Sequence, residues 1–254
     1  GSILYYARAV DNKLLCTIST IGSTQASATQ NTLAECNQLL DHLALHPNDG
    51  ITYKASNMIL AAHSDASYLS EPNARSRAGG HFFLSSDESI PKDNGAILTI
   101  AQIIKAVMSS AAEAELGALY INAREAIYIR QILEEMGHKQ PPTPMQADNS
   151  TAVGIVNNKI LPKATKATDM GFHWLRCRQT KKMFRFFWRP GPTNKGDYPS
   201  KHHAGSHHKN MRPEFLTPKS YLDDFKKRLA KRLAEGGGSF TMKHSSSEGV
   251  LITL

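Results

Sequence analysis

Four acidic residues draw attention because acids are scarce in the middle of this basic chain. They are Asp65 at the end of the apolar stretch AAHSDASY, Glu115 in a long helical pattern, Asp148 at a strand-to-helix turn and Asp197 in the loop TNKGDYPSK. Each has an ordinary structural explanation: Asp148 could cap a helix, Asp65 could close a turn, and the other two could be solvated. When the acids are considered one at a time, the structural explanation is the better one for each.

Taken together, the four carboxylates would suit a divalent metal site. Clustered carboxylates repel one another, so such a cluster is tolerated mainly where divalent cations neutralise it. Mg²⁺ prefers carboxylate oxygens and water over imidazole or thiolate. Two Mg²⁺ ions about 4 Å apart can activate water for attack on a phosphodiester and stabilise the leaving oxygen. The acids therefore predict two-metal hydrolysis, provided that the fold brings them together.

The elements that would position these acids begin near residue 51. Three β-rich stretches, MILAAHSDASY, AGGHFFLSS and GAILTIAQI, have polar connections and predict an antiparallel meander. The longest helical pattern spans residues 108–136 and is followed by Gly137, a favourable C-terminal cap. A short strand and helix around Asp148, a further helix at 165–180 and the strand KMFRFFWRPG follow. The predicted order is β-β-β-α-β-α-α-β.

The helical phase separates the two neighbouring acids of the stretch SSAAEAELGALY. Glu115 lies four residues before Leu119, on the same face as Ala123 and Ala126, which should pack on the sheet. At about 100° per residue, Glu113 points roughly the opposite way. We therefore expect Glu115 to face the strand ends, and Glu113 to be solvated or secondary and replaceable by Gln with little loss.

The chain divides by composition into three predicted parts. Residues 1–50 are helical in character, 51–205 hold the α/β pattern, and 206–254 form a basic tail with an amphipathic helix at 220–234. Such a helix could dock a protein partner or an anionic surface, although packing on its own domain is the commoner outcome.

Overall composition narrows the class of protein. The chain has 30 Lys and Arg against 22 Asp and Glu, a net charge of +8 that favours association with nucleic acid. Its three cysteines lack any CxxC spacing, which argues against a disulfide framework or a zinc knuckle. No apolar run approaches the roughly 20 residues of a membrane span, and the first residues do not resemble a signal peptide. We expect a soluble intracellular protein, in the cytoplasm or nucleus, with no membrane partner.

Several motifs, in order, resemble the ribonuclease H domain of copia-type retrotransposon polyproteins. The family patterns SDADxxG, SSTEAEYMAL, DNxSA, TKHIDIRYHxIR and NxADxxTK are matched here by SDASYLS, SAAEAELGAL, ADNSTAV, TKATDMGFHWLR and NKGDYPSK. Departures include Gly196 before the last acid and Ser200 in place of a threonine. Upstream, ILYYARAVDNKLL through HPNDGITY resembles the end of the reverse transcriptase thumb and connection, without a polymerase YxDD motif.

The resemblance implies a fold, a reaction and a metal site. It implies an α/β ribonuclease H-like fold, a five-stranded mixed sheet with an antiparallel three-stranded meander, then two parallel strands, flanked by helices. Asp65, Glu115 and Asp148 would hold two Mg²⁺ ions, with Asp197 completing the second site and Mn²⁺ able to substitute. The expected activity is that of an endoribonuclease cleaving the RNA strand of RNA/DNA hybrids, recognised through 2′-hydroxyls in the shallow minor groove.

A second interpretation, from another class, is a domesticated and inactive ribonuclease H-like module. It would act as a nucleic-acid-binding or scaffold subunit of a larger ribonucleoprotein complex. The absence of a polymerase motif and the unfamiliar tail motivate it. Because this type of fold hosts both nucleases and non-enzymatic modules, fold analogy alone does not separate the two interpretations.

Basic side chains near the motifs are expected to contact the nucleic-acid backbone, although each could be an ordinary solvated charge. The histidines of SKHHAGSHHK are adjacent pairs rather than an i, i+4 couple, which favours a mobile or phosphate-contacting loop over zinc ligation. The predicted nucleic-acid contacts are Arg75, Arg77, Asn149, Arg176, Arg178, Arg185 and Lys201.

Overall fold

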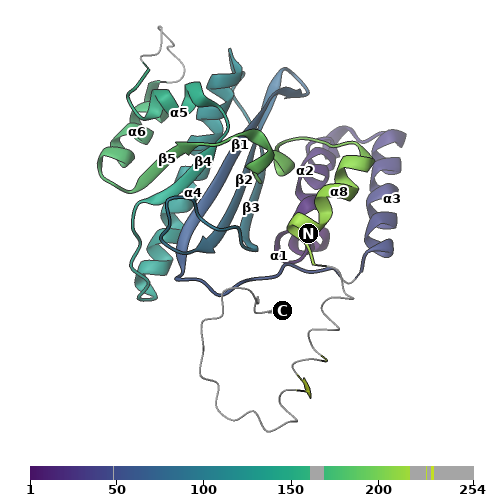
Figure 1. The fold of residues 1–254 in the computed structure, drawn as a ribbon. Coiled ribbons are helices and arrows are strands. Elements are labelled where there is room, and N and C mark those ends of the chain that lie inside the picture. Colours follow the sequence, from purple (N-terminus) through teal and green to yellow (C-terminus); the bar gives the residue numbers. More distant parts are fainter. Residues whose placement is uncertain (48, 161–168, 218–226, 228–229, 232–254) are drawn as a thin grey trace.

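A five-stranded mixed sheet forms the centre of the molecule (Figure 1). The computed structural model describes residues 1–47, 49–160, 169–217, 227 and 230–231. The strand order is β3-β2-β1-β4-β5, with β1–β2 and β2–β3 antiparallel and β1–β4 and β4–β5 parallel. The predicted mixed sheet is therefore confirmed. The strands are β1 (Ile59–Glu71), β2 (Arg75–Ser85), β3 (Ala96–Ile104), β4 (Thr143–Ala147) and β5 (Phe184–Trp188).

Helices flank this sheet, and the predicted element order from β1 to β5 is confirmed. One group, α4 to α6, lies on the side opposite the helices of the amino-terminal lead-in (Figure 1). No helix in the described part of the chain is long and apolar enough to cross a membrane. The predicted amphipathic helix 220–234 lies outside the described residues apart from positions 227, 230 and 231. The helices are α1 (Ser2–Ala9), α2 (Leu15–Ser23), α3 (Gln30–Leu45), α4 (Ala111–Glu135), α5 (Ser150–Val156), α6 (Asp169–Thr180), α7 (Asp197–Ser200) and α8 (Gly205–Phe215), with 3₁₀ turns at Asn12–Leu14, Gln25–Ser27 and Gly191–Thr193.

The main core lies between the sheet and α4. Leu119, Ala123 and Ala126 are fully buried along one stripe of that helix, as the helical spacing predicts. Alanine has a small side chain, so α4 can approach β1 and β2 closely. The helix ends at Glu135, and Gly137 adopts the left-handed backbone conformation (φ 92°) typical of a residue just beyond a helix. This packing determines which face of α4 is oriented toward the ends of the strands.

The amino-terminal helices pack against the meander side of the sheet. Ala101 of β3 contacts a small core formed by α1, α2 and α3. Arg77 of β2 is fully buried; its Nε donates to Glu71 Oε1 at 2.8 Å and its Nη2 donates to Thr20 Oγ1 of α2 at 2.8 Å. The expectation that Arg77 contacts nucleic acid is therefore wrong, because the guanidinium joins the lead-in to the sheet.

The histidine-rich segment is also more ordered than expected. Instead of a mobile loop, residues Gly205–Phe215 form α8, and the His203 ring stacks on Tyr198 with centroids 4.7 Å apart. Phe215 is buried in a cluster with Ile51 and Tyr198. Gly50 forms an antiparallel bridge with Thr217. Burial of these apolar side chains accounts for the order of the segment.

Candidate metal centre

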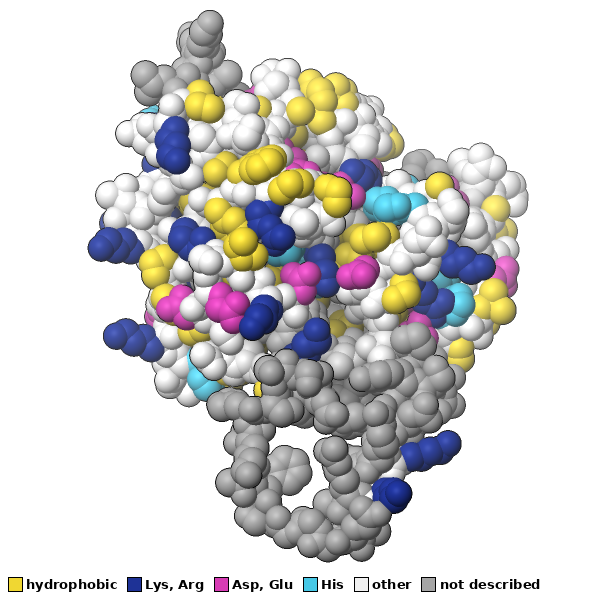
Figure 2. All heavy atoms as spheres, viewed as in Figure 1, with side chains coloured by type: hydrophobic (Ala, Val, Ile, Leu, Met, Phe, Trp, Pro, Cys, Tyr) yellow, Lys and Arg dark blue, Asp and Glu magenta, His cyan; other side chains and the backbone are white. Residues whose placement is uncertain are grey.

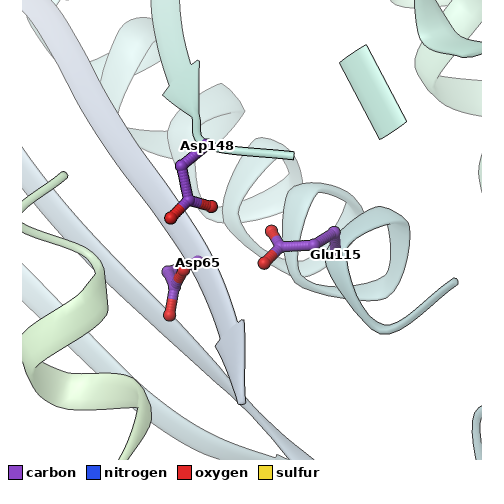
Figure 3. A group of neighbouring side chains, drawn as sticks. All are labelled: Asp65, Glu115 and Asp148. Atoms are coloured by element: carbon purple, nitrogen blue, oxygen red, sulfur yellow. The ribbon is translucent and has the colours of Figure 1, made fainter. Parts of the chain in front are cut away.

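Three of the four predicted acids converge at one point on the sheet (Figure 3). One carboxylate oxygen each from Asp65, Glu115 and Asp148 lies within 4.8 Å of the others. The parallel register of β1 and β4 pairs His63 with Gln146, so two residues further along the chain come Asp65 in β1 and Asp148 just after β4. Glu115 reaches the same point from α4 (Figure 3). The arrangement depends on the parallel pairing of β1 and β4 and on the phase of α4.

The hydrogen bonds of these acids leave one fully buried oxygen without a partner among the described residues. Glu115 Oε1 accepts the Ala66 N–H at 3.2 Å, and Asp65 Oδ2 accepts the Ser200 hydroxyl at 2.6 Å. Glu115 Oε2 is buried and accepts no hydrogen bond from the part of the chain that the structure describes. An unsatisfied buried carboxylate oxygen is costly, and most such groups in proteins have a partner. A divalent cation between the three carboxylates would supply one, so the residues fit a metal ion.

The electrostatics of the group point the same way. Burial, followed by repulsion from Asp65 and Asp148, raises the pKa of Glu115 to about 9. Burial also raises the pKa of Asp65 to about 7, with Asp197 and Asp148 adding to it while the Ser200 hydrogen bond opposes it. Burial and then Asp197 raise the pKa of Asp148. The chain alone therefore disfavours full ionisation at neutral pH, whereas a bound cation would favour it.

Asp197 lies at the margin of this group and is absent from the set of three converging acids. It begins α7, and its carboxylate forms an ion pair with Lys201 one turn later. Its negative charge contributes to the raised pKa values of Asp65 and Asp148, which shows that it is electrostatically close to them. Its role as a ligand of a second metal ion stays a prediction.

Glu113 is not solvated, contrary to expectation. Its side chain is buried, and Glu113 Oε2 accepts the backbone N–H of Ser109 at 2.6 Å. The Ser110 hydroxyl in turn accepts the Glu113 N–H at 3.1 Å. Glu113 thus occupies the third position of α4 and stabilises the start of the helix. The spacing Ser-x-x-Glu, typical of a capping box, was the sequence signal for this role.

Several residues that support the acids were not anticipated. Asn122 of α4 is fully buried and donates to Ser64 Oγ at 2.8 Å and to the Gly79 carbonyl at 2.9 Å. Gly79 lies opposite Asp65 in β2, and a Cβ there would lie 2.2 Å from the Gly196 carbonyl oxygen. Only glycine permits this close approach of the segment before α7. A glycine pair inside a strand pattern was the available signal for a close backbone contact.

The remaining predicted nucleic-acid contacts have varied surroundings. Arg75 is exposed at the start of β2, whereas the Asn149 side chain caps α5 by accepting the Ala152 N–H at 3.0 Å. The guanidinium groups of Arg176, Arg178 and Arg185 lie 4.5, 5.0 and 5.0 Å from the ring centroids of Phe172, Trp174 and Phe187. These contacts hold the arginines in place and leave their part in nucleic-acid binding a prediction.

Ser200 offers a direct test of how the site is held. It is fully buried on α7, its hydroxyl donates to Asp65, and its carbonyl accepts the Ser67 hydroxyl at 2.6 Å. Ser200→Ala leaves Asp65 without this donor, so we expect the affinity for Mn²⁺ to fall about tenfold by calorimetry. Ser85 is also buried, and its hydroxyl donates to the Lys92 carbonyl, away from the acids. Ser85→Ala should therefore leave the affinity for Mn²⁺ unchanged. Equal affinity in both variants would show that Ser200 does not orient Asp65.

Comparison with known proteins gives one curated relative. The chain is 27% identical over 138 residues to the retrovirus-related Pol polyprotein from transposon TNT 1-94 of Nicotiana tabacum. The match covers 54% of this chain but only 10% of that polyprotein, so the chain spans about a tenth of the relative's length. No protein-family model matches the chain. The expected resemblance to a retrotransposon polyprotein is confirmed.

Solved structures to which this chain has a low similarity include ribonucleases H. LC11-RNase H1, isolated from compost, has a TM-score of 0.42 and 11% identity, covering 56% of this chain and 92% of that one. The same protein in complex with an RNA/DNA hybrid has a TM-score of 0.37 and 13% identity, covering 54% and 88%. The N-terminal RNase H domain of a Mycobacterium tuberculosis protein has a TM-score of 0.37 and 14% identity, covering 54% and 86%.

Proposed function

We propose that this chain is a metal-dependent endoribonuclease that cleaves the RNA strand of RNA/DNA hybrids. The observation that carries the proposal is the convergence of three carboxylates, one with a buried oxygen that has no partner among the described residues, on a mixed five-stranded sheet. The similarity to a retrotransposon polyprotein supports it. The ions would be two Mg²⁺, because carboxylate oxygens are the ligands that Mg²⁺ prefers.

The proposed roles follow from the position of each side chain. Two bound Mg²⁺ ions would activate the attacking water and stabilise the leaving oxygen. Asp65 and Glu115, both buried and both accepting hydrogen bonds from the chain, would hold the ions in fixed geometry. Asp148 is only partly buried, so it would be the ligand that a substrate phosphate could approach most easily. Asp197 would complete the second site by exchanging its ion pair with the partly exposed Lys201 for a metal contact.

The charge of the chain suits a polyanionic substrate. Lys and Arg side chains are interspersed with acidic ones across the middle of one face (Figure 2). With a net charge of +8, the protein should attract a nucleic acid, and the affinity should weaken as salt rises. The exposed Arg75 and Lys201 are among the proposed backbone contacts, and Lys201 already forms an ion pair with Asp197.

Other expectations remain proposals. The division into a helical lead-in (1–50), a ribonuclease H-like domain (51–205) and a basic tail (206–254) is one. A protein partner for 220–234 and a location in the cytoplasm or nucleus are others. The scaffold interpretation is less favoured, because a scaffold has no chemical need for three converging carboxylates, two of them buried.

The direct test is a cleavage assay with the full chain. With Mg²⁺, it should cut the labelled RNA strand of an RNA/DNA hybrid and leave the equivalent DNA duplex intact. Asp148→Asn should abolish cutting, whereas Asp87→Asn, which changes an exposed acid in the turn after β2, should not. A hybrid that is bound but stays intact with both Mg²⁺ and Mn²⁺ would overturn the proposed hydrolysis and favour the scaffold interpretation.

A further inference from the structure

Trp188 is an exposed aromatic residue fixed beside the acidic group. It is the last residue of β5, pairs with Ala147 of β4, and its indole Nε1–H donates to the Asp148 carbonyl oxygen at 2.8 Å. Its side chain nevertheless remains 49% exposed. A large aromatic side chain is thus held next to a proposed metal ligand without being used in the core.

The two tryptophans of the chain differ in their surroundings. Trp174 of α6 is covered by the Tyr120 ring, at 5.3 Å between centroids, and by the Arg178 guanidinium. No ring or cation among the described residues stacks on Trp188. Because the Trp188 N–H is already bonded to the chain, the exposed part of the indole offers an apolar surface of fixed orientation. Such a preorganised surface loses little conformational freedom when it binds a ligand.

The surroundings of Trp188 indicate the chemistry of its ligand. The segment that follows lies against Asp148, since a Cβ on Gly191 would lie 3.0 Å from Asp148 Oδ2. Arg189 is next in sequence, and its Nη1 donates to Gln146 Oε1 at 3.4 Å. Arg185 lies on the opposite face of the strand, with its guanidinium over the Phe187 ring. An exposed aromatic surface beside a group of converging carboxylates, in a chain of net charge +8, is suited to nucleic acid, where rings contact bases or sugars with little regard to sequence. In a paired hybrid the bases are stacked on each other, which leaves the sugars of the shallow minor groove accessible.

We propose that Trp188 is a substrate-binding residue that packs against a ribose of the RNA strand, next to the phosphate positioned at Asp148. This inference rests on the proposed function and adds a specific contact to it. Since the indole N–H is not free to bond a 2′-hydroxyl, the contact contributes affinity rather than discrimination between RNA and DNA. The hybrid-to-duplex preference should therefore not depend on Trp188.

The presence of only two tryptophans makes a spectroscopic test possible. In Trp174→Phe, Trp188 is the sole tryptophan, and its fluorescence should change in a saturable way when the full chain is titrated with an RNA/DNA hybrid. Ca²⁺ replaces Mg²⁺ here, since it takes oxygen ligands in a different geometry. The matched variant Trp188→Phe retains only Trp174 and should show no change. Binding detected by anisotropy of a labelled hybrid, with no change at Trp188, would overturn the proposal.

Substitutions at Trp188 separate binding from support of Asp148. Trp188→Ala should raise the Kd for the hybrid and the KM for its cleavage about tenfold with kcat little changed, and Trp188→Phe should recover most of this loss. If the residue served only to anchor Asp148 through its N–H, both variants would lower Mn²⁺ affinity equally, and the proposal would be wrong. A fluorescence response without any cleavage would support the contact while refuting the proposed function. Cleavage by Trp188→Ala with an unchanged KM would support the proposed function while refuting the contact.

Discussion

Replacing Glu115 by Gln is expected to reduce Mg²⁺-dependent cleavage of an RNA/DNA hybrid by about 10³-fold or more. Glu115 is buried and its Oε2 has no hydrogen-bond partner among the described residues, so its negative charge is available to a cation. Glutamine has nearly the same shape but is neutral and cannot replace an anionic ligand. Initial rates at saturating Mg²⁺, measured with a labelled RNA strand, check the prediction.

Glu113 provides a matched control on the same helix. It lies two residues earlier, is also buried, and accepts the Ser109 N–H. Glutamine can still accept this hydrogen bond through its amide oxygen, so Glu113→Gln should cost only about 0.5–1 kcal/mol of stability. Its cleavage rate should stay within about twofold of the original enzyme. A loss of cleavage in Glu113→Gln together with activity in Glu115→Gln would contradict the phase assigned to α4.

The sequence predicted the elements that carry local signals. Apolar steps of three and four residues defined α4, and its phase placed Glu115 rather than Glu113 toward the strands. Strand patterns defined β1 to β3, and the polar connections between them indicated antiparallel pairing. The parallel strands β4 and β5 were expected only from the family resemblance, and the pairing of β1 with β4, which brings Asp65 beside Asp148, was a finding of the structure. Hydrophobic periodicity contains no information about which distant strand becomes a neighbour.

Long-range contacts explain where sequence reasoning failed. Arg77 occurs in the polar stretch EPNARSRAGG, but β2 already begins at Arg75. Arg77 is buried because Glu71 and Thr20 of α2 supply its partners. The Thr20 contact joins residues 57 positions apart, so no local pattern indicates it. Glu113 is different, because its capping spacing was visible in the sequence and was not given weight.

The short helix α7 joins the acidic group to the lead-in, which has consequences for experiments. Ser200 bonds Asp65 on one side, and after Lys201 the His202 ring lies 2.9 Å from Thr20 of α2. Thr20 also accepts the hydrogen bond from the buried Arg77. Removing residues 1–50 would leave Arg77 buried with only part of its partners, or exposed without them, at a cost in stability. The catalytic tests are therefore best made on the full chain.

The stability of the metal-free protein should fall as pH rises from 7 to 9. The pKa of Glu115 is raised to about 9 in the folded state, against an ordinary value of 4.5. A carboxyl with a raised folded pKa favours folding below its unfolded pKa, and this contribution is lost as pH rises through the folded pKa. The pKa of Asp65 is raised to about 7, so most of the contribution of this carboxyl to stability is already lost below pH 7. Buried His63, with its pKa lowered to about 4, is neutral throughout and does not interfere.

One such group changes the unfolding free energy by at most about 1.4 kcal/mol per pH unit, so Tm should drop on the order of 5 °C between pH 7 and pH 9 in EDTA. Millimolar Mg²⁺ should restore Tm at pH 9, because the cation binds the ionised carboxylates of the folded state alone. Glu115→Gln carries no titrating group at this position, so its Tm should depend little on pH in this window and respond weakly to Mg²⁺. Thermal unfolding followed by circular dichroism gives both curves. A metal-free wild-type Tm that is flat or rises from pH 7 to pH 9 would mean that Glu115 is not held in a site that disfavours its charge, and the case for a cation at this position would fall with it.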